Sequence, residues 1–123
     1  MAISKILVVD DSPTDRTYVT ELLACSGYEV ITAEDGTAAI AKAQAERPDL
    51  VLMDVVMPGI NGFQATRAIS TGSETKHIPV IICTTKSQET DRVWGMRQGA
   101  RDYLVKPINK DQLIGKIQAL AAN

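Results

Sequence analysis

Residues 50–59 read LVLMDVVMPG, and Asp54 is the one charged residue in this stretch. The apolar run that precedes it is typical of a strand that is buried on both faces of a parallel sheet. Burying an ionised carboxylate costs free energy unless a cation pairs with it or it coordinates a metal. Asp54 is therefore expected to end a buried strand beside such a partner.

Two other apolar runs also end in charged residues. Asp10 and Asp11 follow the run at residues 6–9, and Lys106 follows the run at residues 103–105. If these runs are parallel strands of one sheet, their charged ends meet at one edge, since sites in such sheets form outside the carboxyl ends of the strands. The sequence therefore predicts one site with three carboxylates and an ammonium group.

Strand-length apolar runs alternate with segments of helical composition along the whole chain. Strands are expected at about residues 5–9, 29–33, 49–54, 79–84 and 102–105. Helices are expected at about residues 12–27, 36–47, 62–70, 87–99 and 110–121. This alternation is typical of βαβ units, and it predicts a single α/β domain over residues 1–123, with a parallel sheet covered on both faces and no output domain.

Composition excludes several classes of protein. A net charge of −2 gives no basic surface for nucleic acid, and no apolar stretch is long enough to span a membrane. The early acidic pair argues against a secretory signal. Cys25 and Cys83 are too few and too far apart for a disulfide framework or a zinc site, so both are expected to be free and packed as small hydrophobic residues. We expect a soluble, cytoplasmic protein.

The first expected helix begins with a local capping signal. Ser12 and Asp15 are three residues apart and resemble a capping box, in which each side chain bonds to the other residue's backbone N–H. The helix should then turn Val19, Leu22 and Leu23 toward the sheet.

The fourth expected helix carries the only tryptophan of the chain. Val93, Met96 and Ala100 recur at helical spacing and are expected to face the sheet. Trp94 would then be partly exposed, as rim packing or as a contact for a partner.

The residues at the predicted site are chemically suited to a phosphoryl group. Clustered carboxylates repel one another unless a proton or a cation intervenes, and ligation by oxygen alone favours Mg²⁺. Lys106 adds a fixed positive charge, while Thr84 offers a hydroxyl and Thr85 a backbone N–H. Such donors around one carboxylate form a receptor for a phosphoryl group, which Asp54 can accept covalently as an acyl phosphate.

Four motifs, in order and at consistent spacing, carry a family resemblance over essentially the entire chain. They are Val9-Asp10-Asp11-Ser12, Leu52-Met53-Asp54-Val55-Val56-Met57-Pro58-Gly59, Cys83-Thr84-Thr85 and Tyr103-Leu104-Val105-Lys106-Pro107. Together they resemble the receiver domain of bacterial response regulators. The resemblance implies a flavodoxin-like (βα)5 three-layer sandwich, with five parallel strands in the order 2-1-3-4-5.

The resemblance also implies roles for the acidic residues. Asp54 matches the phosphoacceptor, which is also a Mg²⁺ ligand, and Lys106 matches its ammonium partner. Asp11 matches a direct Mg²⁺ ligand, Asp10 a carboxylate that holds the metal mainly through water, and Val56 the residue whose backbone carbonyl is a further ligand.

A second group of roles concerns the response to phosphorylation. Thr84 matches a hydroxyl that moves toward the phosphoryl oxygens, and Thr85 a backbone contact to them. Tyr103 matches an aromatic that turns inward with this hydroxyl, although it is equally compatible with a half-buried ring whose hydroxyl stays in water. The peptide bond between Lys106 and Pro107 is expected to be cis.

The function implied is that of a stand-alone, monomeric response regulator. It would take a phosphoryl group from a chemotaxis-type histidine kinase with Mg²⁺ as cofactor, without being an enzyme beyond assisting its own phosphorylation and dephosphorylation. The face made by the fourth helix, fifth strand and fifth helix would contact a downstream protein. Residues 61–67 and 85–103 resemble, more closely, receivers that control type IV pili and twitching motility; the alternatives are a receiver acting on a flagellar motor and a phosphate sink.

Three other interpretations remain. A small phosphatase could use Asp54 as nucleophile, but Val56 replaces the second carboxylate that the common haloacid-type enzymes have. A flavin mononucleotide carrier would bind phosphate at the loop where Asp10 and Asp11 repel it, and a receiver that has lost phosphorylation would not need its motifs intact.

At the position of Val56 many receivers have a polar residue that helps to position the attacking water, and in the geometry of the family Lys86 lies opposite this position. Because Val56 is apolar, we expect slow loss of the phosphoryl group.

Overall fold

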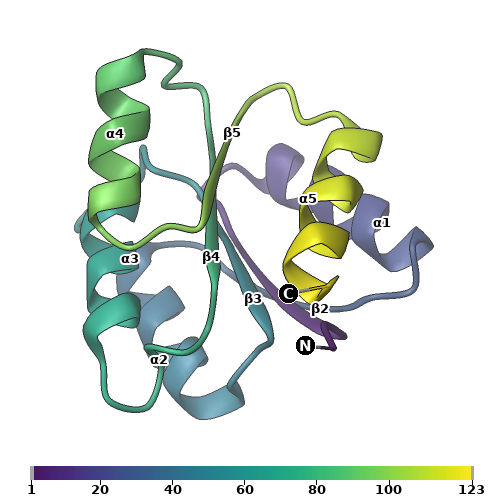
Figure 1. Cartoon of the computed structure of the whole chain (residues 1–123), viewed down its shortest axis with the longest axis horizontal. Helices are drawn as coiled ribbons and strands as arrows, with labels where there is room; N and C mark the ends of the chain where they lie inside the picture. The colour runs from purple at the N-terminus through teal and green to yellow at the C-terminus, as the bar shows by residue number, and fades with distance from the viewer. Residues whose placement is uncertain (1, 123) are drawn as a thin grey trace.

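The computed structural model describes residues 2–122 and contains every predicted element, with bounds within two residues of those expected. The elements are β1 Lys5–Val9, α1 Pro13–Cys25, β2 Glu29–Ala33, α2 Gly36–Glu46, β3 Leu50–Met53, α3 Gly62–Thr71, β4 Val80–Thr84, α4 Glu89–Arg97, β5 Asp102–Val105 and α5 Lys110–Ala122. Strand and helix alternate from one end of the described chain to the other (Figure 1).

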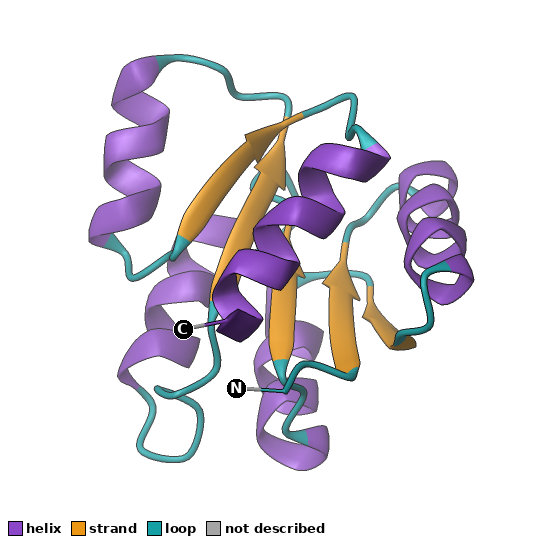
Figure 2. Ribbon diagram, turned by 45° about the vertical axis from the view of Figure 1, so that its right-hand side comes forward, coloured by secondary structure: helices purple, strands orange, loops and turns teal. Residues whose placement is uncertain are grey.

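The strands form one parallel sheet in the order β2-β1-β3-β4-β5, which confirms the flavodoxin-like fold (Figure 2). Helices α1 and α5 cover one face of this sheet, while α2, α3 and α4 cover the other. In the described part of the chain, no helix is both long and apolar enough to cross a membrane.

The core is divided between the two faces of the sheet because successive residues of a strand point to opposite faces. In β1, Ile6 and Val8 pack with α1 and α5, whereas Leu7 and Val9 pack with α2 and α3. Burying each such side chain contributes roughly 1.5–3 kcal/mol relative to leaving it in water. The strand is fixed from both sides, and so is the position of the acidic pair that follows it.

The buried face of α4 differs from the expected one. Val93 and Met96 are 42 % and 38 % exposed, and the helix packs on the sheet through Gly95 instead. A Cβ at Gly95 would lie 2.8 Å from the Cδ1 of Ile82 and 3.2 Å from the ring of Tyr103. The missing side chain lets the helix backbone approach the sheet, which turns the larger apolar residues outward.

The cysteines are both free, as predicted, but only Cys83 is buried. Cys25 at the end of α1 is exposed, so the expectation that both pack as small hydrophobic residues was wrong for this one. Burial raises the pKa of the Cys83 thiol to about 12, which keeps it protonated.

Asp49 joins the start of β1 to the start of β3. Its Oδ2 accepts hydrogen bonds from the backbone N–H groups of Lys5 (3.0 Å) and Ser4 (2.9 Å) and from the Ser4 hydroxyl (3.2 Å). The bond from the Lys5 backbone is the main reason why the pKa of Asp49 lies below its ordinary value of 3.8. The carboxylate therefore stabilises the folded state only while it is ionised.

Asp49→Ala is expected to lower the free energy of unfolding by about 1–2 kcal/mol at neutral pH, because two backbone donors lose a charged acceptor at a partly exposed position. The folded-state pKa is depressed, so the contribution is present above pH 3.8 and is lost as the pH falls through the folded-state value. Urea unfolding of wild type and variant at several pH values measures this difference. Asp111→Ala, at an exposed site in α5, serves as the control; a loss that is independent of pH would contradict the assignment.

Candidate functional site

The charged residues lie at one edge of the sheet, directly after the carboxyl ends of β1, β3 and β5. Backbone hydrogen bonds extend the sheet to these positions. The N–H of Asp54 donates to the carbonyl of Val9 at 3.0 Å, and that of Lys106 donates to the carbonyl of Thr84 at 2.8 Å. The parallel register therefore brings together residues that are far apart in the sequence, as predicted.

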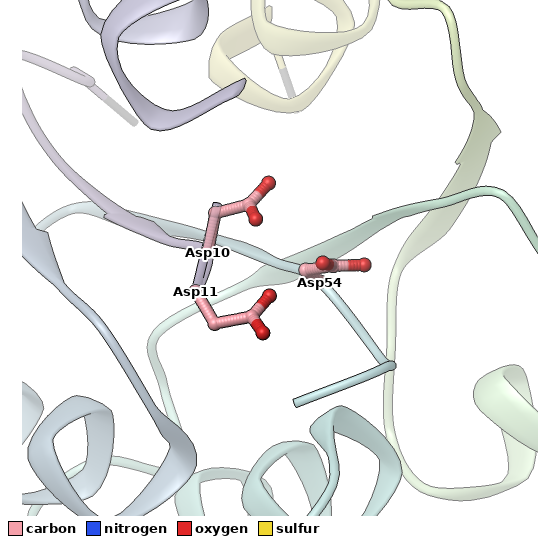
Figure 3. A group of neighbouring side chains, drawn as sticks. All are labelled: Asp10, Asp11 and Asp54. Atoms are coloured by element: carbon pink, nitrogen blue, oxygen red, sulfur yellow. The ribbon is translucent and has the colours of Figure 1, made fainter. Parts of the chain in front are cut away.

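Asp10, Asp11 and Asp54 form a compact acidic cluster (Figure 3). Their nearest carboxylate oxygens all lie within 4.8 Å of one another. Asp10 and Asp54 are only 4 % and 7 % exposed, while Asp11 is open to solvent. Oxygen ligands at this spacing, with one side open for water, fit Mg²⁺, which keeps several waters when carboxylates bind it.

Asp54 lies in an environment that disfavours its charge. Burial raises its pKa above the ordinary value, and the negative charge of Asp10 adds to this effect, while the positive charge of Lys106 works against it. Oδ1 accepts a hydrogen bond from the N–H of Val55 at 2.8 Å, and Oδ2 lies 3.5 Å from the Lys106 Nζ. A cation bound beside Asp54 would therefore stabilise its ionised form.

Lys106 is shared by three carboxylates. Its Nζ lies 2.8 Å from Asp10 and 2.9 Å from Asp15, closer than the 3.5 Å to Asp54. Burial alone would lower the pKa of Lys106, but the hydrogen bonds to Asp10 and Asp15 and the charge of Asp54 outweigh it and raise the pKa. Lys106 therefore stays charged, and its peptide bond to Pro107 is cis, as expected.

Asp15 and Arg16 are two residues of the site whose positions were not predicted. The Ser12 hydroxyl accepts from the N–H of Asp15 at 3.3 Å, but the Asp15 carboxylate binds Lys106 rather than returning to the backbone, so the capping box was wrong in this half. Arg16 donates to the carbonyl of Asp10 at 2.8 Å. Both residues lie in the first helical turn after the acidic pair, and this position is the sequence feature that could have placed them at the site.

Thr84 and Tyr103 meet at one residue, Lys86. The N–H of Lys86 donates to the Thr84 hydroxyl oxygen at 3.4 Å, and the Tyr103 hydroxyl donates to the carbonyl of Lys86 at 2.8 Å. Tyr103 is only 5 % exposed, and burial raises its pKa to about 12. The alternative in which its ring is half-buried and its hydroxyl stays in water is wrong; the ring points inward.

Thr85 and Val56 lie at the rim of the site. Thr85 follows β4 and is exposed, and the Val56 side chain is 58 % exposed two residues after Asp54. Both residues follow strands, β3 and β4, whose carboxyl ends lie at the edge of the sheet where the acidic cluster lies. The backbone contacts implied for the two residues stay predictions.

A family model for the response regulator receiver domain matches residues 6–118. The chain belongs to the response regulator receiver family. Receiver domains act in two-component phosphorelay signalling, so the chain has a histidine kinase as phosphodonor and protein partners downstream.

Two curated relatives illustrate the range of this receiver family. Protein PilH of Pseudomonas aeruginosa is 56 % identical over 97 % of the chain and 98 % of its own length. The response regulator PleD of Caulobacter vibrioides is 39 % identical over 95 % of the chain, which spans only 26 % of that protein. The same receiver therefore occurs in proteins of very different length.

Solved receiver structures share the fold. The chemotaxis protein CheY4 of Vibrio cholerae has a TM-score of 0.89 at 40 % identity, covering 96 % of this chain and 98 % of that one. The receiver domain of a sensor histidine kinase from Pseudomonas aeruginosa has a TM-score of 0.90 at 32 % identity, covering 99 % and 100 %. The latter has a magnesium ion coordinated in its active site cleft.

Proposed function

We propose that Asp54 accepts a phosphoryl group from a phosphohistidine of a chemotaxis-type kinase. The observation that carries this proposal is a buried carboxylate with two further carboxylates and an ammonium group beside it. Asp11, Asp10, Asp54 and the backbone carbonyl of Val56 would hold Mg²⁺, which, when bound, neutralises charge on the phosphoryl oxygens.

The residues of the chain supply the remaining chemistry. An oxygen of ionised Asp54 attacks phosphorus, the bond from phosphorus to the histidine nitrogen breaks, and its electron pair returns to the imidazole. Lys106 would move from its contacts with Asp10 and Asp15 toward the phosphoryl oxygens, adding a charge-assisted hydrogen bond. Because the Lys106 ammonium stays charged, this assistance does not need a proton transfer.

We further propose that the phosphoryl group shifts an equilibrium between two conformations. Thr84 would turn its hydroxyl toward the phosphoryl oxygens, Thr85 would donate its backbone N–H, and Tyr103 would report the change to the surface. The chain would be a monomer, and its face made by α4, β5 and α5 would then bind a downstream protein. Autophosphatase activity aside, the chain would signal in the cytoplasm rather than catalyse a reaction on another molecule.

The likeness to PilH over nearly the full length of both chains supports a role in a chemotaxis-like system that controls type IV pili and twitching motility. The likeness to CheY4 supports the alternative, a receiver that acts on a flagellar motor or drains phosphate from a kinase. A deletion strain complemented with this chain separates the two, by twitching zone on a surface and swimming zone in soft agar.

Phosphotransfer from purified, autophosphorylated chemotaxis-type kinases tests the chemistry. Labelling of the wild-type chain should require Mg²⁺ and should be absent in Asp54→Ala. Asp49→Ala, which changes a carboxylate outside the site, should still be labelled. Label that survives in Asp54→Ala would overturn the assignment of the phosphoacceptor.

Val56→Asn is expected to accelerate loss of the phosphoryl group by about tenfold, because an amide at this exposed position would orient an attacking water. Release of inorganic phosphate from the isolated phosphorylated protein measures the rate. Val105→Asn, also an exposed valine, is the matched control and should leave the rate unchanged. An unchanged rate in Val56→Asn would mean that Val56 does not set the lifetime.

A further inference from the structure

A groove of about 570 Å³ runs between α3 and α4, which lie next to each other on one side of the sheet (Figure 1). It opens on the α3 side of α4, away from the face that α4 shares with β5 and α5. Phe63 and Gln98 line it and are almost fully buried, while Trp94, which is 51 % exposed, forms a wall. A half-exposed indole beside a buried phenylalanine and polar side chains is typical of a binding surface.

The groove has a positive rim and no acidic lining. Arg67 of α3 is exposed at its edge and makes no ion pair within residues 2–122. Glutamine, asparagine and threonine account for its other polar lining residues. An anionic group on a ligand would therefore find a free guanidinium and no like charge.

A second hollow of about 400 Å³ continues the groove toward the phosphorylation site. It shares Asn61, Phe63 and Trp94 with the first and adds Lys86 and Val56, again without an acidic lining residue. The Lys86 Nζ is 3.9 Å from its nearest carboxylate oxygen, so it is only loosely paired. The two hollows together place one cation at each end of an aromatic wall.

We propose that this continuous groove binds an acidic segment of a protein partner, which inserts an aromatic or aliphatic side chain against Trp94 and places carboxylates near Arg67 and Lys86. Charge complementarity selects this occupant, since Arg67 has no ion pair within residues 2–122, Lys86 is paired only with Asp91 at 3.9 Å, and no acid lines either hollow. The surface is distinct from the α4, β5 and α5 face proposed for output. Its binding does not require phosphorylation of Asp54.

Trp94 provides the measurement, because it is the only tryptophan. The probe is a synthetic peptide without tryptophan that has one phenylalanine flanked by aspartates, and a second peptide replaces the aspartates with lysines. Trp94 emission should change saturably with the acidic peptide, with a Kd on the order of 100 μM, and should not change with the basic peptide. No saturation, or equal binding of both peptides, would overturn the proposal.

Two charge reversals locate the binding site. Arg67→Glu should weaken binding of the acidic peptide by at least about tenfold. Arg97→Glu makes the same change of charge at an exposed residue of α4 that lines neither hollow, and should have little effect. Equal weakening by both variants would indicate a general effect of charge and would overturn the assignment of the binding site to this groove.

Two further measurements distinguish peptide binding from phosphorylation and from self-association. Circular dichroism establishes that the variants fold, and Asp54→Asn should bind the peptide like wild type, so a failure of the phosphorylation proposal would not affect this result. Sedimentation of the free protein tests for a second copy as the occupant. If the free protein forms dimers that Arg67→Glu abolishes, the groove would be occupied by a second copy of the chain, and the proposal of a different protein as its occupant would be overturned.

Discussion

Asp54→Asn is expected to abolish phosphoryl labelling and to make the metal-free protein more stable than wild type. The amide is not a nucleophile, so transfer stops. The same change removes a buried negative charge that lies beside Asp10 and Asp11, while the shape of the side chain is kept. The gain in the free energy of unfolding should be on the order of 1 kcal/mol at neutral pH.

The dependence on pH follows from the direction of the Asp54 pKa shift. Burial raises the folded-state pKa above 3.8, so the folded wild-type protein holds its proton to a higher pH than the unfolded chain does. The cost of the charge is absent below pH 3.8 and appears as the pH rises through the folded-state value. The stability difference between variant and wild type should therefore widen with rising pH.

Added Mg²⁺ should reverse the order of stability. Binding of the ion to the folded state raises the free energy of unfolding of the wild-type protein. It raises that of Asp54→Asn by less, because one ligand has lost its charge. Urea unfolding with and without Mg²⁺ measures both effects, with Asp111→Asn as a control outside the cluster. A variant that is less stable than wild type in the absence of metal would show that Lys106 compensates the charge of Asp54 fully.

Gly62→Ala is expected to lower the free energy of unfolding by about 3 kcal/mol or more. A Cβ at Gly62 would overlap the carbonyl oxygen of Asp54, and would lie 2.7 Å from its carbonyl carbon and 2.8 Å from the Cα of Val55. These are backbone atoms, so no rotamer change relieves the clash. Either α3 or the segment that carries Asp54 must move.

Gly115→Ala is the matched control for this substitution. Gly115 lies within α5, and a Cβ there meets nothing within 4 Å. Alanine should stabilise that helix by about 0.5–1 kcal/mol, because alanine loses less conformational entropy on folding than glycine does. Thermal unfolding of both variants measures the contrast, and a Gly62→Ala protein as stable as wild type would show that the close approach is relaxed in solution.

The fold and the acidic cluster were predictable because their signals are local. An apolar run followed by a charge marks the ends of β1, β3 and β5, and parallel pairing then brings Asp10, Asp54 and Lys106 to one edge. The helix positions Val19, Leu22 and Leu23 were also predicted to be buried, and the structure confirms them. In these places the pattern of the sequence and the packing agree.

The remaining features depend on contacts that no local pattern contains. Asp15 and Lys106 are 91 positions apart, so their ion pair follows from tertiary structure alone. The orientation of α4 depends on Gly95, because helical periodicity assumes that large apolar residues face the core, and a glycine that permits a closer approach reverses this. The contact of Gly62 with the backbone of Asp54 depends on the path of the loop after β3.

The sharing of Lys106 among carboxylates also determines how charge is distributed over the molecule. The charged groups joined at this edge are Asp10, Asp11, Asp15, Glu34, Asp54, Lys106 and Arg16, with Glu34 3.4 Å from Arg16. Five negative and two positive charges leave −3 here, against −2 for the whole chain. This edge of the sheet is therefore more negative than the chain as a whole and draws divalent cations, with a field that is screened beyond about 10 Å at 0.1 M salt.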